Sequence, residues 1–244
     1  SITNISYAHS KNFRSIKLIA AAKAEIINNI KSGGSVVLNM DDNFYRYHKN
    51  LALKKKLKVI SFGIKNKSAM TKLIKIKKIK NKYELLIKIN GSSLAIYSQN
   101  DNQNHLYNIL ATLAVVNLFA DIKKLNKDFF LNFKTPIGRG DISKVKLKNK
   151  EIFLVDESYN SNPLSLKMAI ENYDKIKLRN SKKYLILGDM LELGKHSIKQ
   201  HKLISKILNK TKINQVYVVG KYIKETFKGL KPNKKAKILN NKFS

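Results

Sequence analysis

The chain has 244 residues, 43% of them hydrophobic, which is enough for one large domain or for two ordinary domains with separate cores. Cysteine is absent, which excludes disulfides and thiolate metal sites. No leader sequence opens the chain, and its most apolar segment, residues 109–120, contains Thr112 and Asn117 and is too short to cross a bilayer. We therefore expect a cytoplasmic protein with no membrane insertion.

The formal net charge of +33 would ordinarily indicate nucleic acid or an anionic membrane as the partner. Among the 49 basic residues, however, only Arg14, Arg46, Arg139 and Arg179 are arginines, the residue that makes the better bidentate contacts with phosphates and bases. The lysines are spread along the whole chain and mixed with Asn and Ile. This pattern favours a compositional bias, so we expect no nucleic-acid partner.

The first sixty residues alternate between helical and strand patterns. Apolar spacing predicts a helix over residues 15–30, which ends before a Gly33-Gly34 turn. Short apolar runs then predict buried strands at 35–39 and at 58–62. Strands that alternate with helices indicate a parallel α/β sheet.

The pattern changes to a period of two over residues 72–97. The turn dipeptide Asn90-Gly91 separates the alternating runs 83–89 and 93–97, which is a strong β-hairpin signal. A helix is predicted next, at about 105–119, from the spacing of its apolar residues.

Pro and Gly residues interrupt the pattern at 135–140, and we place a domain boundary there, between residues 1–134 and 135–244. Strands and helices then alternate again, as in a doubly wound, Rossmann-like fold. Strands are predicted at 152–155, 184–187 and 216–219, and helices at 162–173 and 197–208.

Two polar motifs follow the first two of these strands. Residues 156–163 read DESYNSNP and residues 188–194 read GDMLELG. Because ligands of such sheets bind at the carboxyl ends of the strands, we expect both loops to face one crevice. Asn162 could simply cap the helix that begins at Pro163, but capping accounts for one Asn of the motif only.

Four further patterns are ordinary when each is taken alone. They are Asn4-Ile-Ser-Tyr-Ala-His9 with Lys23 downstream, Asn39-Met-Asp41-Asp42 after a strand, Asn104-His105-Leu-Tyr-Asn108 at a helix start, and Gly138-Arg139. A lone histidine is more often structural, a helical lysine is usually solvated, and Asp-rich turns occur in most α/β proteins.

Taken together, these motifs resemble those of the Mur ligase family. Residues 156–163 resemble the signature D-D-x-Y-N-A-N-P, with Glu157 and Ser161 in place of Asp and Ala, and residues 188–194 match a second signature. The pair is typical of the members that join D-alanyl-D-alanine to UDP-N-acetylmuramoyl-tripeptide. The resemblance implies an α/β fold, with residues 1–134 as the C-terminal half of a central ATP-binding domain and 135–244 as a Rossmann-like C-terminal domain.

The resemblance also implies roles for particular residues. His9 would bind a magnesium ion, and Lys23 would be carbamylated by carbon dioxide, which turns its cation into an oxygen ligand for such a hard metal. The nucleotide side would comprise Asn108, His105, Arg139, Asp156 and Glu157. The dipeptide side would comprise Tyr159, Asn160, Asn162 and Asp189.

The activity implied is ATP-dependent amide synthesis through an acyl phosphate, by a monomer active in peptidoglycan synthesis and hence in cell-wall biogenesis, cell shape and cell division. The chain contains no Gly-Lys-Ser or Gly-Lys-Thr phosphate loop, and it reaches Ser244 without a K-G-S-R-like segment. We therefore expect part of an enzyme, inactive alone. Two alternatives remain open: a sister ligase for another amino acid or for folate, and a non-catalytic basic binding module.

Overall fold

The computed structural model describes the chain except residues 8–9, 134–136, 149, 178–180 and 241–244. Its contacts divide the protein into two units. The first unit comprises Ser1–Ile5 and Lys17–Lys134, and the second comprises Ser6–Ile16 and Thr135–Ser244. The sequence analysis assigned residues 6–16 to the first domain, but they pack within the second unit, where residues 10–12 contact residues 194–196.

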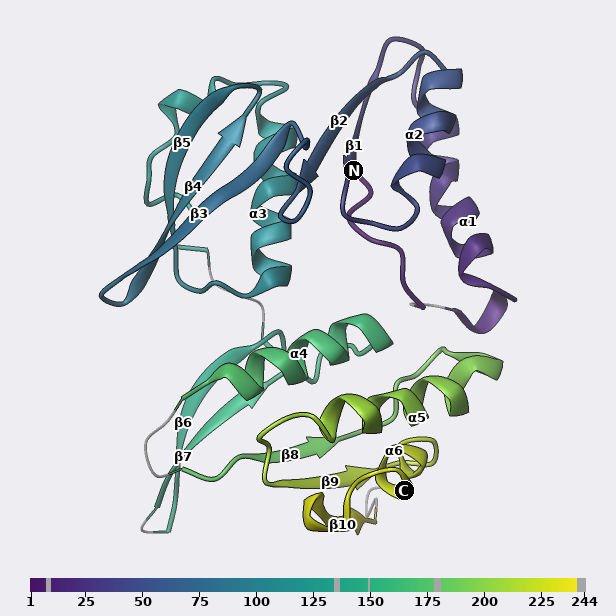
Figure 1. The fold of residues 1–244 in the computed structure, drawn as a ribbon, viewed down its shortest axis with the longest axis vertical. Helices are drawn as coiled ribbons and strands as arrows, with labels where there is room; N and C mark the ends of the chain where they lie inside the picture. Colours follow the sequence, from purple (N-terminus) through teal and green to yellow (C-terminus); the bar gives the residue numbers. More distant parts are fainter. Residues whose placement is uncertain (8–9, 134–136, 149, 178–180, 241–244) are drawn as a thin grey trace. The chain divides into compact units, whose positions relative to one another are not determined.

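The first unit is built on a five-stranded mixed sheet with the order β1-β2-β3-β4-β5 (Figure 1). The first three strands are parallel, and the last three are antiparallel. Ile2 adds an isolated parallel bridge to Leu38 of β1. The strands are β1 (Ser35–Asn39), β2 (Lys58–Gly63), β3 (Thr71–Ile79), β4 (Lys82–Ile89) and β5 (Ser92–Ser98).

The turn between β4 and β5 explains why the hairpin could be predicted. Asn90 and Gly91 both have positive φ, 47° and 92°. A two-residue turn of this kind matches the twist of the flanking strands and favours Asn-Gly. The predicted hairpin is therefore confirmed, with β4 one residue longer at its outer end and β5 one residue longer at each end than expected.

Helix α3 (Gln103–Val116) supplies one side of the core of the first unit. Its apolar residues pack on strand residues such as Phe62, Leu85 and Ile96, which are fully buried. Helix α1 (Ile16–Asn28) confirms the first predicted helix. Helix α2 (Tyr45–Lys54), which packs on β1 and β2, was not predicted, and a short 3-10 helix, η2, spans Ile122–Lys124.

The second unit contains a three-stranded parallel sheet with the order β10-β9-β8 (Figure 1). Its core combines strand residues Leu187 and Val218 with helix residues Ile170 and Ile204. The strands are β8 (Tyr184–Leu187), β9 (Gln215–Val219) and β10 (Lys235–Leu239). The helices are α4 (Pro163–Lys175), α5 (Ser197–Leu208) and α6 (Lys224–Lys228), with the 3-10 turns η1 (Ser10–Asn12), η3 (Gly194–His196) and η4 (Pro232–Lys234).

One prediction for this unit was wrong. Residues 152–155 were expected to form a strand of the Rossmann-like parallel sheet. They lie instead in β7 (Lys150–Asp156), which pairs antiparallel with β6 (Asp141–Leu147) in a separate two-stranded sheet. β7 has no partner in the parallel sheet among the described residues, so its apolar side chains remain exposed, for example Leu154 at 51%.

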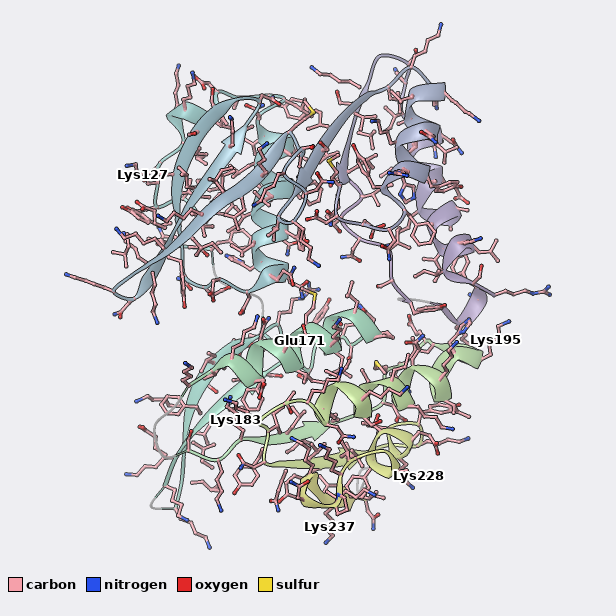
Figure 2. All side chains as sticks on the ribbon, viewed as in Figure 1. Lys127, Glu171, Lys183, Lys195, Lys228 and Lys237 are labelled. Atoms are coloured by element: carbon pink, nitrogen blue, oxygen red, sulfur yellow. The ribbon has the colours of Figure 1, made fainter. Side chains whose placement is uncertain are left out.

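Within the described part of the chain, no helix has the length and apolar character needed to span a bilayer. Lysine side chains project from both units, including the labelled Lys127, Lys183 and Lys228 (Figure 2). The distribution over both units agrees with the spread of lysine along the sequence.

Candidate functional site

The turn after β1 is organised by Asp41. Its Oδ2 accepts hydrogen bonds from the backbone N–H of Ile64 at 2.6 Å and of Lys65 at 2.9 Å, and from the Tyr107 hydroxyl at 2.9 Å. Its Oδ1 accepts the N–H of Asn66 at 2.7 Å. Four donors from two distant segments therefore converge on one carboxylate.

These contacts change the acidity of both side chains. Burial alone would raise the pKa of Asp41, but the three backbone N–H groups and the phenol outweigh it and hold the pKa below the ordinary value. Burial, and then the Asp41 carboxylate, raise the pKa of Tyr107. The sequence analysis regarded this turn as ordinary. In the structure, Asp41 joins the turn to residues 64–66 and to Tyr107 of α3.

The neighbouring residues fix the first five residues of the chain on β1. Asp42 accepts the N–H of Ile5 at 2.8 Å, and the Asn39 side-chain amide donates to the Thr3 carbonyl at 2.8 Å. In turn, the Asn39 side-chain oxygen accepts the N–H of Asp41 at 2.9 Å. The side chains of Asn39, Asp41 and Asp42 are thus all hydrogen-bonded within the protein.

Lys23 lies beside this N-terminal segment. Its Nζ donates to the Asn4 carbonyl at 3.1 Å, and the side chain as a whole is exposed. The site therefore leaves the amine accessible to a small reagent. His9, the other residue that the resemblance assigns to a metal, lies outside the described residues.

His105 and Asn108 lie three residues apart on α3. Asn108 is exposed and lines a shallow depression in the first unit, together with Ser1 and Thr3. His105 is half-buried, and its Nε2 is buried with no hydrogen-bond partner among the described residues. Burial also lowers the pKa of His105, which favours the neutral ring.

Four predicted residues come together where β6 begins and β7 ends. The Arg139 guanidinium stacks on the Tyr159 ring, 4.4 Å from its centroid. The turn that carries Arg139 is held by the Gly140 N–H on the Asp156 carbonyl at 2.6 Å and the Tyr159 N–H on the Gly138 carbonyl at 3.1 Å. Gly138 has a φ of 77°, and a Cβ there would lie 2.9 Å from the Tyr159 nitrogen, so glycine is required.

The carboxylates of this cluster differ in acidity. Hydrogen bonds from the Ser158 side chain and backbone lower the pKa of Asp156. Partial burial of the carboxyl group, with the nearby charges of Asp141 and Asp156, raises the pKa of Glu157. Much of the Glu157 residue remains exposed, which limits the contribution of burial. The cluster thus combines one cation with carboxylates of unequal proton affinity.

Asn162 serves as the N-cap of α4. Its Oδ1 accepts the N–H groups of Leu164 and Ser165, each at 3.0 Å, and the Ser165 hydroxyl accepts the Asn162 N–H at 3.0 Å. The helix starts at Pro163, as the sequence predicted. Asn160 is exposed.

Asp189 organises the loops at the ends of β8 and β9. Its Oδ2 accepts the Lys221 N–H at 2.8 Å, and its Oδ1 accepts the Ile223 N–H at 2.7 Å. Gly220, with φ of 131°, passes so close that a Cβ there would lie 2.6 Å from the Asp189 carboxyl carbon. The prediction that residues 156–163 and 188–194 face one crevice assumed that they follow strands of one sheet, but β7 and β8 belong to different sheets.

Sequence reasoning missed the buried His201. Its Nδ1 lies 2.7 Å from the Ser197 carbonyl, and its Nε2 accepts the Met190 N–H at 3.0 Å. These partners require the tautomer with the proton on Nδ1, so the 3.9 Å approach of Nε2 to Asp189 is not an ion pair. The only available signal was a histidine on the apolar face of a predicted helix.

A metal ion and a nucleotide would each need particular side chains at this site. Among the described residues, no group of three or more His, Asp or Glu side chains is arranged to hold a metal ion. The described part of the chain therefore does not fit magnesium by itself. The exposed Asn108 amide in the depression fits the polar edge of an adenine ring, and the Arg139 guanidinium fits a phosphate.

The sequence of the chain is similar to those of known proteins. Residues 1–116 match the Mur ligase middle domain. The UDP-N-acetylmuramoyl-tripeptide--D-alanyl-D-alanine ligase of Rickettsia prowazekii is 30% identical over 239 residues, which cover 97% of this chain and 51% of that protein. The chain belongs to the Mur ligase family.

Solved structures show the same fold. MurF from Acinetobacter baumannii superposes with a TM-score of 0.82 at 20% identity, over 97% of this chain and 49% of that one. MurF ligase from Thermotoga maritima in complex with ADP gives 0.75 at 22% identity, over 97% and 51%. The α/β prediction is thereby confirmed. The chain spans about half the length of the curated relatives it matches.

Proposed function

We propose that the chain is part of an ATP-dependent ligase that joins D-alanyl-D-alanine to UDP-N-acetylmuramoyl-tripeptide, in the synthesis of peptidoglycan. The observation that carries the proposal is the continuous alignment with a ligase of that name from Rickettsia prowazekii, which covers 97% of the chain and therefore both units. The proposed protein works in the cytoplasm as a monomer and serves cell-wall biogenesis, and through it cell shape and division.

ATP would supply the phosphoryl group that activates the tripeptide carboxylate as an acyl phosphate. His105 and Asn108 would lie on the adenine side, and the exposed Asn108 amide would bond the ring. Arg139 would neutralise phosphate charge, and its guanidinium lies over the Tyr159 ring, 4.4 Å from the centroid. Asp156 and Glu157 would complete the nucleotide side.

The incoming dipeptide would meet the loop that contains Tyr159, Asn160 and Asn162 and the loop of Asp189. Asn162 and Asp189 already bond backbone N–H groups, so they would act by fixing the loops.

In the proposed protein, His9 and a carbamylated Lys23 would bind magnesium, as the resemblance implies. Lys23 is exposed and donates to the Asn4 carbonyl, so carbon dioxide in solution can reach its side chain. Among the described residues, no group of three or more His, Asp or Glu side chains could hold the ion without His9.

The experiment uses protein from the complete reading frame that contains this sequence. Phosphate release from ATP with UDP-N-acetylmuramoyl-tripeptide is measured with D-alanyl-D-alanine and, separately, with alanine or glutamate. We expect release to depend on the dipeptide, and equal rates with all acceptors would refute the assignment in favour of a sister ligase. Binding of duplex DNA with a steep salt dependence, together with no ligase activity, would instead indicate a basic binding module.

Arg139→Ala tests the nucleotide side, with Arg46→Ala, an exposed arginine of α2, as the matched control. We expect only the first variant to weaken ADP binding in a calorimetric titration. Equal affinity of the two variants would remove Arg139 from the proposed site.

A further inference from the structure

Two loops leave the same edge of the parallel sheet in the second unit. Residues 188–193 follow β8, and residues 220–223 follow β9, which pairs with β8 in parallel (Figure 1). Ligands of such sheets bind at the carboxyl ends of the strands. We infer that His201 of α5 is a positioning residue for this edge: its ring holds residues 188–193 in the conformation that binds the dipeptide. The link to the dipeptide rests on the proposed function, whereas the contacts of His201 do not.

The ring of His201 is completely buried, and both of its nitrogens are hydrogen-bonded. Nδ1 lies 2.7 Å from the Ser197 carbonyl oxygen, which can only accept, so Nδ1 carries the proton. Nε2 is therefore free to accept the Met190 N–H at 3.0 Å. A buried N–H without an acceptor is costly, so this bond fixes the direction of the peptide group that joins Asp189 to Met190.

Asp189, at the other end of that peptide group, fastens the second loop. Its carboxylate accepts the N–H groups of Lys221 and Ile223, at 2.8 Å and 2.7 Å. Gly220 passes so close to this carboxylate that a Cβ there would collide with it. The orientation of the Asp189 side chain, and with it the position of the second loop, therefore depends on the peptide group that His201 holds.

The backbone of His201 is tied to the second loop as well. The buried Thr226 hydroxyl donates to the His201 carbonyl at 2.6 Å. Thr226 belongs to α6, which begins directly after residues 220–223. His201 thus contacts the first loop through its ring and the helix that follows the second loop through its carbonyl. One residue bonded on both sides keeps the two loops at a fixed spacing.

The part of the first loop that His201 holds includes a segment open to solvent. Met190 and Leu193 are each 1% exposed and belong to the core of the second unit. Leu191, between them in the sequence, is 73% exposed. The buried anchors therefore present an exposed tip at the ligand edge of the sheet, where its position can affect a bound dipeptide.

The holding contact is tested by hydrogen–deuterium exchange on protein from the complete reading frame. His201→Gln places an acceptor oxygen near the position of Nε2, whereas His201→Met has almost the same length but only a weak acceptor. We expect the Met190 amide to exchange about tenfold faster in His201→Met than in His201→Gln, with equal protection of β9 in both.

His48 of α2 provides the matched control. It is also a buried histidine, with Nε2 3.0 Å from the Ala20 carbonyl, but it belongs to the first unit. His48→Gln and His48→Met should leave the exchange of the Met190 amide unchanged.

Equal exchange of the Met190 amide in the two His201 variants would overturn the inference. If His201→Met does not fold, or also exposes the amides of β9, His201→Asn takes its place, because Asn is polar but too short to reach the Met190 N–H. If His201→Asn disturbs β9 too, His201 supports the whole unit, and its role as a positioning residue is refuted.

The link to the dipeptide is tested by steady-state kinetics of the same variants. We expect His201→Met to raise the KM for D-alanyl-D-alanine about tenfold with the KM for ATP unchanged, and His201→Gln to restore most of the affinity. A smaller folded fraction would lower kcat and leave both KM values as they are.

Faster exchange of the Met190 amide with an unchanged KM for the dipeptide would refute the link to the substrate. An equal rise of this KM in His201→Gln and His201→Met would show that the acceptor is not what matters, and would also refute the inference. If the unsubstituted protein has no ligase activity with the dipeptide, the proposed function fails, while the exchange result still decides the holding role.

Discussion

Replacing Asp41 by Asn tests whether this carboxylate holds the first unit together. The substitution keeps the shape of the side chain but turns one oxygen into an NH2 group and removes the charge. If the NH2 group takes the place of Oδ1, the Asn66 N–H loses its acceptor. If it takes the place of Oδ2, the N–H groups of Ile64 and Lys65 lose theirs, and the Tyr107 hydroxyl must turn away.

The expected loss follows from these bonds. A hydrogen bond to a charged group contributes about 1.5–3 kcal/mol and a neutral one about 0.5–1.5, so each surviving bond weakens by roughly 1 kcal/mol. An orphaned donor adds about 1–3 kcal/mol. Because Asp41 is only partly buried and water can reach some donors, we expect a total near 3 kcal/mol, a large part of the roughly 5–15 kcal/mol that stabilises a domain.

The assay is urea unfolding with exchange of the amides of residues 64–66 as the local probe, and Asp101→Asn, at an exposed aspartate, is the matched control. Since the pKa of Asp41 is lowered on folding, its contribution is complete above the unfolded pKa of about 4 and is lost as the pH falls through the folded value. The deficit of Asp41→Asn should therefore shrink in acid. A midpoint equal to that of Asp101→Asn at pH 7 would refute the reasoning.

Three further substitutions address the second unit. Asn162→Ala should lower stability by about 1 kcal/mol in thermal unfolding, because α4 loses its cap, and a changed KM for D-alanyl-D-alanine at unchanged stability would instead indicate direct substrate contact. Gly220→Ala should destabilise by about 2 kcal/mol or more in urea, because its Cβ would collide with Asp189, and full stability would contradict this close approach. In Arg139→Lys, loss of the planar stack on Tyr159 should lower kcat several-fold, and an unchanged kcat would show that charge alone suffices.

Local signals explain which elements could be predicted. The hairpin at Asn90-Gly91 and helix α3 have strong period-two and helical patterns and were found. Helix α2 was missed because only His48 and Ala52 are buried in it, so its apolar stripe is too sparse to recognise. The strand at 152–155 was found, but its antiparallel partner β6 was not, because strand pairing depends on long-range register that a local apolar run does not encode.

The candidate site also has residues that the sequence predicted and contacts that it did not. Arg139, Asp156, Glu157 and Tyr159 were expected near the nucleotide or the dipeptide, and the structure brings them together around one turn. The bonds of Asp189 to residues 221 and 223 join loops that no local pattern relates. Such contacts follow from tertiary structure alone.

The contact between Phe13 and His196 spans 183 residues, and this separation matters while the protein is being made. At about 5–20 residues per second, the N-terminal segment leaves the ribosome roughly ten to forty seconds before its partner loop exists. During that interval the first unit can complete its own sheet, but residues 6–16 have no surface to occupy. The contact of Phe13 with His196 is therefore a late step of folding, and synthesis that stops before Gly194 leaves Lys11 and Phe13 without their partners in that loop.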